Sequence, residues 1–124
     1  MNIKTTNFVL DSKTREYLNK KVDSLSKFIN PNDDSINLDI ELGKTTEHHQ
    51  KGDIYRAEFN LSVGGEFYRT EENSEDILSS IDLAIEELSK QLRRYKTKKE
   101  TLFKRGAGKI KEMIHRFDPR KNNE

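Results

Sequence analysis

The sequence contains no cysteine and no tryptophan, and it has only two prolines among 124 residues. Without cysteine there is no disulfide framework, which is compatible with a reducing compartment. No apolar run approaches the roughly 20 residues that a membrane span requires. The N-terminal stretch MNIKTTNFVLDSK is too polar for a signal peptide. We therefore expect a soluble, cytoplasmic protein that does not contact a membrane.

Apolar residues are scarce, at 31% of the chain, whereas charged residues make up 36%. A chain of this length predicts one domain with a modest core, burying roughly 60–65% of the unfolded surface. The net charge of +1 hides an asymmetry: residues 1–89 contain 10 Lys/Arg and 18 Asp/Glu, whereas residues 90–124 contain 13 and 4. Such an asymmetry predicts a polyanionic partner for the basic part.

Apolar periodicity predicts six secondary-structure elements. They are a strand at 3–10, a helix at 13–29, strands at 36–42, 54–63 and 66–71, and a helix from about 75 to about 100. Asp11 or Ser12 is expected to cap the first helix, and Asn73 or Ser74 the second. Gly64-Gly65 predicts a two-residue hairpin. Gly106 and Gly108 are expected to end the second helix.

The order β-α-β-β-β-α favours an α+β fold in which each strand has one apolar face and each helix one apolar stripe. We expect a four-stranded, mostly antiparallel sheet with both helices packed on one face. The other face of the sheet would be polar and solvated. The predicted organisation is one α+β domain at 1–100, followed by a basic flexible tail at 101–124.

The most basic stretch is KQLRRYKTKK, residues 90–99, in which six of ten residues are Lys or Arg. One interpretation is that these cations complement the dipole at the C-terminal end of a helix, an effect confined to the last turn. The stretch spans nearly three turns, however, and Lys90, Arg94 and Lys98 recur at steps of four along one face. A row of cations at roughly 6 Å spacing matches successive phosphates of a nucleic-acid strand, and basic residues of the first helix would widen the surface.

The predicted outward positions of the sheet exclude one common kind of RNA surface. An RNA-recognition motif displays aromatic residues there, on which bases stack. The outward positions here are Asn37, Asp39, Glu41, Arg56, Glu58, Asn60 and Ser62. A nucleic-acid surface is therefore expected on the helical side, where it would recognise the shape and backbone of structured RNA.

The chain resembles the ribosome hibernation-promoting factors, also called ribosome-associated inhibitors or sigma-54 modulation proteins. The resemblance covers about residues 2–100. It rests on the element order, on INLDIEL, on YRAEFNLSVGGEFY and above all on SEDILSSIDLAIEELSKQLRRYKTKK. In that last segment the family pattern is met by Asp76, by Ile81-Asp82, by Leu88 and by Gln91 to Lys98.

The resemblance implies a function without catalysis. Such proteins bind the small ribosomal subunit in the decoding channel between head and body, contact ribosomal RNA, compete with mRNA and tRNA, and silence translation during stress or stationary phase. By motif position, Lys21, Lys27, Lys90, Arg94 and Lys98 would contact RNA. With their neighbours, the expected RNA-binding residues are Lys20, Lys21, Lys27, Lys90, Arg93, Arg94, Lys96, Lys98 and Lys99.

The sequence departs from the family pattern in two places. Ile77-Leu78 stand where the family often has a tyrosine, and Glu87 stands where a lysine is common, which weakens the local positive field. The length resembles that of the short members, which lack a second, dimerising domain, and we expect a monomer away from the ribosome. Whether the basic tail promotes or prevents pairing of ribosomes stays open.

No other motif predicts a metal, a cofactor or an enzyme. His48, His49 and His115 could suggest a metal, but adjacent histidines in a loop lack a defined ligand geometry. No carboxylate pair stands out for acid–base work, and no glycine-rich loop precedes a helix. Two alternatives remain: a protein-interaction module that docks its basic ridge on an acidic protein, and a general double-stranded RNA-binding protein.

Overall fold

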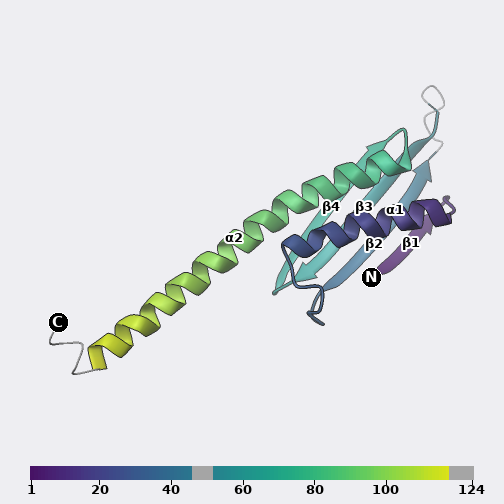
Figure 1. The fold of residues 1–124 in the computed structure, drawn as a ribbon. Helices are drawn as coiled ribbons and strands as arrows, with labels where there is room; N and C mark the ends of the chain where they lie inside the picture. Colours follow the sequence, from purple (N-terminus) through teal and green to yellow (C-terminus); the bar gives the residue numbers. More distant parts are fainter. Residues whose placement is uncertain (46–51, 118–124) are drawn as a thin grey trace. The chain divides into compact units, whose positions relative to one another are not determined.

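The computed structural model describes the backbone of residues 1–45 and 52–117 and the side chains through residue 106. Three elements precede residue 37: β1 (Asn2–Thr6), α1 (Ser12–Asp23) and the 3-10 helix η1 (Ser24–Lys27). Four follow: β2 (Asn37–Thr45), β3 (Ile54–Val63), β4 (Glu66–Ser74) and α2 (Ile77–Phe117) (Figure 1). The predicted order β-α-β-β-β-α is confirmed.

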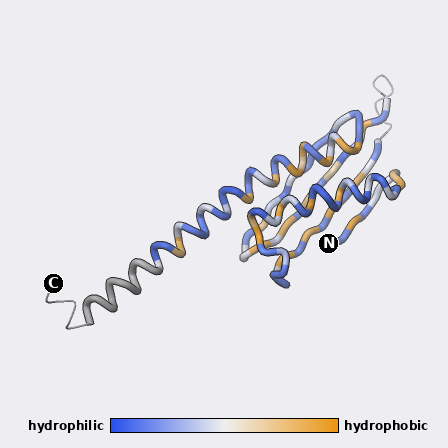
Figure 2. Tube along the Cα trace, viewed as in Figure 1, coloured by the Kyte–Doolittle hydropathy of each residue, from blue (hydrophilic) through white to orange (hydrophobic). Residues whose placement is uncertain are grey.

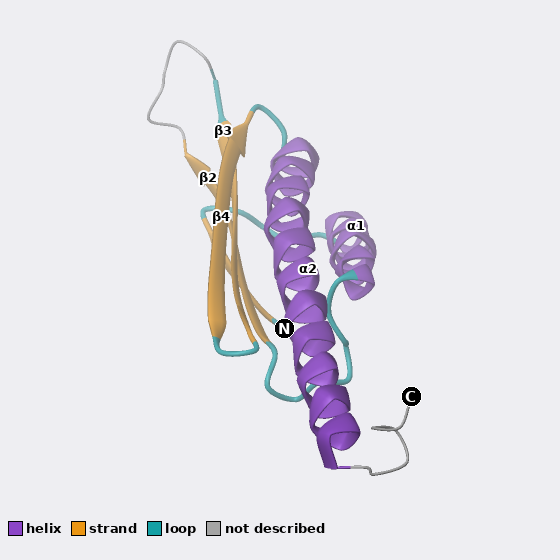
Figure 3. Cartoon of the chain, turned by 90° about the vertical axis from the view of Figure 1, so that its left-hand side faces the viewer, coloured by secondary structure: helices purple, strands orange, loops and turns teal. Residues whose placement is uncertain are grey.

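The four strands form one mixed sheet in the order β1-β2-β3-β4. β1 pairs with β2 in parallel, with Ile3 opposite Ile40, whereas β2 with β3 and β3 with β4 pair antiparallel. Figure 3 shows α1 and the first part of α2 on the same side of this sheet. The predicted fold class, a largely antiparallel sheet with two helices on one face, is confirmed.

The chain divides into two compact units, residues 1–93 and 94–124. The first contains the sheet, α1, η1 and the start of α2, and it holds the core. Hydrophobic and hydrophilic residues alternate along the strands of the sheet (Figure 2), and apolar residues of β2 and β3 such as Leu42, Phe59 and Leu61 are fully buried. Leu18 of α1 and Ile81, Leu88 and Leu92 of α2 complete this layer, also at 0% exposure. The core lies between the sheet and the two helices.

The hairpin between β3 and β4 is the predicted one. Gly64 and Gly65 have φ values of 56° and 78°, in the left-handed region that favours glycine. Two successive residues of this kind form the tight turn whose twist matches that of the flanking strands. Val63 and Glu66 are therefore paired directly across the turn.

The first helix is shorter than predicted. α1 ends at Asp23 and the chain continues as η1, so the expected single helix over 13–29 is two helical segments. Asp11 caps α1 as expected, because its Oδ1 accepts a 2.7 Å hydrogen bond from the Thr14 amide. Hydrogen bonding to the Thr14 side chain, and then to its amide, holds the pKa of Asp11 below its usual value.

The second helix differs from the prediction at both ends. Asn73 and Ser74 belong to β4, where Ser74 pairs with Tyr55, because cross-strand hydrogen bonds extend the strand. The cap is instead Asp76, whose side chain accepts from the Ser79 amide at 3.2 Å. At the other end, α2 runs through Gly106 and Gly108 to Phe117 instead of ending near residue 100.

Glycine inside a helix costs about 1 kcal/mol relative to alanine, but it leaves the backbone hydrogen bond intact, unlike proline. Two glycines therefore need not end a helix with good helix formers on both sides. Residues 118–124, the end of the predicted flexible tail, lie outside the described residues. The division into a domain at 1–100 and a flexible tail stays a prediction.

A buried serine fixes the start of α2 on the sheet. The Ser80 side chain is fully buried, and its hydroxyl lies 2.9 Å from the Tyr55 carbonyl oxygen of β3 and 2.7 Å from the Ser74 hydroxyl of β4. One turn later, the buried Thr70 hydroxyl of β4 donates to the Ala84 carbonyl at 3.1 Å. The first part of α2 thus lies over β3 and β4.

Among the described residues, no helix combines the length and apolarity of a membrane span.

Candidate nucleic-acid interface

The cations of the first helical segment face away from the core. Leu18 and Leu25 are buried against the sheet, and this orientation turns Lys20 and Lys27 outward, where both are exposed. Residues 12–27 carry five Lys or Arg and two Asp or Glu. The segment is therefore a basic surface, and it includes three of the nine predicted RNA-binding residues.

Lys21 differs from its neighbours because it has a partner on α2. Its ammonium group lies 3.3 Å from Asp82 Oδ1 and 5.4 Å from the centre of the Tyr17 ring. The Tyr17 hydroxyl donates a 2.6 Å hydrogen bond to the same Asp82 oxygen. The hydrogen bond to Asp82 raises the pKa of Lys21 and also that of Tyr17. We call these three residues the interhelix clamp.

The interhelix clamp joins α1 to α2 and keeps Lys21 charged at the seam between them. The sequence predicted an RNA contact for Lys21, and the structure adds an intramolecular role. Tyr17 and Asp82 were not among the predicted site residues, although Ile81-Asp82 was part of the family pattern. Tyr17 and Lys21 lie one helical turn apart, but nothing in the sequence pairs them with Asp82, which is 65 residues from Tyr17.

Two more predicted residues, Lys90 and Arg93, lie at the end of the part of α2 that belongs to the first unit. Lys90 is exposed, and the Arg93 guanidinium lies 5.8 Å from the centre of the Phe28 ring. Phe28 follows η1 directly, so this contact of a cation with an aromatic face is a second link between the two helical segments. Lys21, Arg93 and their partners thus follow the seam between α1 and α2.

The other four predicted residues belong to the second unit, in which α2 continues. Arg94, Lys96, Lys98 and Lys99 are all exposed. Residues 94–106 carry six Lys or Arg and one carboxylate, Glu100, whereas residues 77–93 of the same helix carry two cations and three carboxylates. The positive charge of α2 therefore begins at Lys90, as the sequence indicated.

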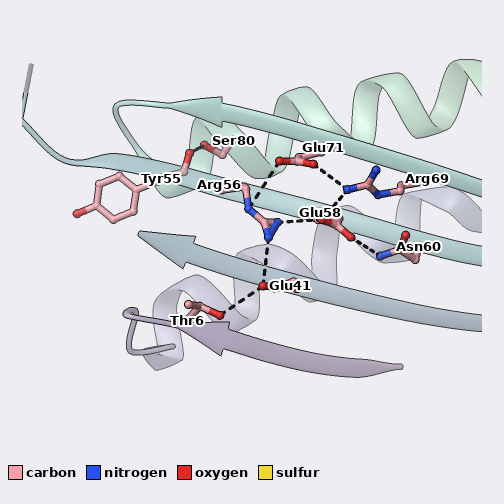
Figure 4. Close-up of polar contacts among 9 residues, drawn as sticks. All are labelled: Thr6, Glu41, Tyr55, Arg56, Glu58, Asn60, Arg69, Glu71 and Ser80. Atoms are coloured by element: carbon pink, nitrogen blue, oxygen red, sulfur yellow. Dashed lines mark hydrogen bonds and ion pairs between the residues drawn. The ribbon is translucent and has the colours of Figure 1, made fainter. Parts of the chain in front are cut away.

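On the opposite face of the sheet, charged side chains form ion pairs with one another (Figure 4). The Arg56 guanidinium lies 3.1 Å from Glu41, 2.9 Å from Glu58 and 3.7 Å from Glu71. Arg69 lies 3.2 Å from Glu58 and 2.9 Å from Glu71. Hydrogen bonds from Arg69 and Asn60 hold the pKa of Glu58 below its usual value. We call these residues the outer-face network.

The outer-face network confirms that this face is polar and not a base-stacking platform. One aromatic residue of the described strands, Phe67 of β4, lies on it, and 63% of this residue is exposed. A single ring at the sheet edge cannot stack the two or three bases that such platforms hold. Phe67 was not among the predicted outward residues, which all belong to β2 and β3.

Within the described residues, no group of three histidines or carboxylates could hold a metal ion. His48, His49 and the side chain of His115 lie outside the described residues. The helical segments present exposed ammonium and guanidinium groups at helical spacing. Such groups displace the counterions that surround nucleic-acid phosphates, and they bind without base recognition.

Comparison with known proteins identifies relatives of this chain. Residues 1–100 match the family described as sigma 54 modulation protein / S30EA ribosomal protein. The chain is 30% identical over 97 residues to a ribosome hibernation promotion factor of Lactococcus lactis, and 24% identical over 96 residues to one of Picosynechococcus. These matches cover 78% and 77% of this chain but 49% and 48% of the relatives. The chain thus spans about half the length of the curated relatives it matches.

Solved structures share the fold. The N-terminal domain of Thermus thermophilus Protein Y has a TM-score of 0.57 at 24% identity, over 77% of this chain and 99% of that domain. A ribosomal subunit interface protein from Coxiella burnetii also has a TM-score of 0.57 at 24% identity, over 78% of this chain and 99% of that protein.

Proposed function

Because the chain belongs to the family of sigma 54 modulation proteins and S30EA ribosomal proteins, we propose that it is a ribosome hibernation factor. It binds the small ribosomal subunit through ribosomal RNA in the decoding channel, and its folded body fills space that mRNA and tRNA require. Translation is silenced in this way during stress or stationary phase. The protein acts in the cytoplasm, where the ribosomes are, and needs neither catalysis nor a cofactor.

The family match over residues 1–100 is the observation that carries this proposal. The placement of charge supports it, because the predicted cations lie on the helical segments and their side chains are at least partly exposed. The proposed RNA-contacting residues are Lys20, Lys21, Lys27, Lys90, Arg93, Arg94, Lys96, Lys98 and Lys99. Each exposed cation that contacts a phosphate releases a condensed counterion, so binding is expected to weaken steeply with salt.

The outer-face network contributes to selectivity in this proposal. Its three carboxylates, Glu41, Glu58 and Glu71, outnumber its two guanidinium groups, Arg56 and Arg69. A face of this kind repels phosphates or leaves them unbound, which favours one orientation on RNA over all others. The protein therefore presents its helical side to the ribosome.

The proposal is tested by sucrose-gradient sedimentation of the purified protein with ribosomes and with separated subunits of the same organism. We expect co-migration with the small subunit, lost when mRNA and initiator tRNA are bound first. Protein that stays at the top of every gradient would refute the proposal and favour an acidic protein partner. Displacement by bulk duplex RNA, but not by mRNA and tRNA, would identify a general RNA-binding protein instead.

A further inference from the structure

A cleft opens at the end of the sheet where β1 and β2 begin. Asn2 of β1 is opposite Asp39 of β2 at this end, and Leu38 is opposite Leu61, near the end of β3. The loop 28–36 leads from η1 to the start of β2 (Figure 1). The cleft between η1, this loop and the sheet has a volume of about 430 Å³. This volume lies within the range of ligand-binding pockets, roughly 300–1,000 Å³.

The floor of the cleft is apolar and belongs to the core. Leu25, Leu38 and Leu61 line it and are 2%, 7% and 0% exposed. Three further apolar residues line the cleft and are only half-buried: Val22, Ile29 and Ile36. An apolar side chain inserted from outside would remove the exposed parts of these three residues from water, which favours binding.

The rim of the cleft is acidic. Among the described residues, Asp23 and Asp33 line it with exposed carboxylates, and no Lys or Arg side chain lines it. The adjoining sequence has the same sign of charge, because residues 28–43 contain four Asp or Glu and no Lys or Arg. A concave surface of this kind attracts cations and repels phosphates. The cleft therefore differs in charge from the basic helical surface of the same unit.

The loop that forms one wall of the cleft is ordered by its own hydrogen bonds. The Asp33 side chain accepts from the Ser35 amide at 2.9 Å and from the Ser35 hydroxyl at 2.7 Å. The Asn30 side chain accepts from the Asn32 amide at 3.0 Å, and the Ile36 amide donates to the Asp33 carbonyl at 3.2 Å. A partner thus meets a wall that is already formed, and binding costs little conformational entropy there.

We propose that this cleft binds a basic polypeptide segment. One large apolar side chain of the segment lies on the apolar floor, and its Lys or Arg residues lie beside Asp23 and Asp33. RNA is excluded as the occupant, because the rim repels phosphates and the apolar floor offers a polar backbone no hydrogen-bond partner.

The source of the segment follows from the proposed function, on which this part of the inference rests. Proteins that neutralise the phosphates of ribosomal RNA do so with Lys and Arg, so their segments have the charge that the rim requires. The partner is therefore a protein of the small subunit. The helical cations contact RNA, and the cleft contacts protein.

An NMR titration of the natural chain tests the cleft without the ribosome. The probe is the peptide KRLFRK. Its controls are KRSGRK, which lacks the apolar side chains, and EELFEE, which reverses the charge. We expect KRLFRK to shift the amide signals of Ser26, Ile29 and Ile36, and each control to bind at least about tenfold more weakly. No binding of KRLFRK at millimolar concentration, equal binding of the three peptides, or shifts confined to other surfaces would overturn the proposal.

Two kinds of variant separate the floor from the rim. Ser26 lines the cleft and is exposed, so Ser26→Trp can fill the cleft without disturbing the core, and Ser26→Ala is its matched control. S26W should bind KRLFRK at least about tenfold more weakly, whereas S26A should bind it as the natural chain does. Asp23→Asn combined with Asp33→Asn removes both charges and should also weaken binding, most clearly at low salt. Circular dichroism checks the fold, and full binding by a folded S26W would show that the peptide lies elsewhere.

Crosslinking on the small subunit tests the kind of partner. Asn32 is exposed between two residues that line the cleft, Pro31 and Asp33, and it can be replaced by p-azidophenylalanine. We expect this position to crosslink to a protein of the small subunit, and the same substitution at Lys90 to crosslink to ribosomal RNA. A crosslink from position 32 to RNA would overturn the assignment of a protein partner. If the natural chain did not sediment with small subunits, the proposed function would fail, and the peptide titration would still decide whether the cleft binds a basic segment.

Discussion

The Tyr17 hydroxyl donates a 2.6 Å hydrogen bond to Asp82 Oδ1 and so connects α1 to α2 across 65 residues of sequence. Lys21 lies 3.3 Å from the same oxygen. Since the two helices carry cations proposed to contact RNA, this contact helps to determine how those cations are spaced. It therefore links the stability of the helical layer to the geometry of the proposed interface.

The first prediction concerns this contact. Tyr17→Phe removes the hydrogen bond and should lower the free energy of unfolding by about 1 kcal/mol. Asp82→Ala removes the hydrogen bond and the ion pair, and it should cost more. Urea denaturation measures both, and the double variant should cost less than the sum because the partners are coupled. Strict additivity would contradict a direct interaction.

The second prediction concerns Ser80, which is fully buried beside the Tyr55 carbonyl. Ser80→Ala removes the hydroxyl that satisfies this carbonyl, and it should lower the free energy of unfolding by about 1–2 kcal/mol. Ser89→Ala, on the same helix but only half-buried, is the control and should change stability by less than about 0.5 kcal/mol. Equal effects of the two substitutions would mean that the contact with β3 is not important.

The third prediction is a pH dependence. The folded-state pKa of Glu58 lies below its usual value because Arg69 and Asn60 donate hydrogen bonds to the carboxylate. Its contribution to stability is therefore present at neutral pH and is lost as the pH falls below about 4.5, the usual glutamate value. Wild type should melt at a higher temperature than E58Q at pH 7, and the difference should shrink by pH 3. A constant difference would exclude a role for the ionised carboxylate.

The fourth prediction concerns the proposed RNA contacts. K90E/R94E/K98E should no longer pellet with small ribosomal subunits, because three cations become three anions. For a single change, Lys20→Glu should weaken binding, whereas Lys4→Glu, on the outer sheet face, is the matched control and should not. Binding of the natural chain should fall with salt at a log–log slope of several units. If the triple variant pelleted as the natural chain does, the assignment of Lys90, Arg94 and Lys98 to the RNA interface would be wrong.

The fifth prediction compares two glycines. Gly106 lies within α2, and a Cβ added there would meet no other atom. Gly106→Ala should therefore stabilise the helix by up to about 1 kcal/mol and increase the helix content. Gly65 also has open space, but its φ of 78° strains any other side chain, so Gly65→Ala should destabilise the hairpin by about 1 kcal/mol. Circular dichroism at 222 nm and urea denaturation measure the two effects. A loss of helix in the first variant would contradict the continuation of α2.

The sequence was sufficient where a local pattern determines the structure. Alternation predicted β3 with its observed bounds, 54–63, and Gly64-Gly65 predicted the turn. It was insufficient where distant residues decide. β4 extends to Ser74 because Tyr55 pairs with it, and this took the predicted cap residues into the strand. The start of α2 shifted for the same reason, whereas its end was wrong because glycine inside a helix does not remove a backbone hydrogen bond.

The candidate site was predictable as a set of residue types but not as an arrangement. Spacing along one helix identified Lys90 and its neighbours as a basic row. Nothing local indicated that Lys21 would meet Asp82, or that Arg93 would lie over Phe28. Contacts between separate helical segments depend on how each segment packs on the sheet, and that packing is visible only in three dimensions.

The parallel pairing of β1 with β2 has a consequence for how the chain folds as it is made. β3 needs only two intervening residues to meet β4, and such short loops close fastest, so the central hairpin can form early. β1 is synthesised first, but Ile3 must wait for Ile40, beyond a whole helix. Loop-closure entropy favours the short connection over the long one. The first strand to be synthesised is therefore expected to be the last to join the sheet.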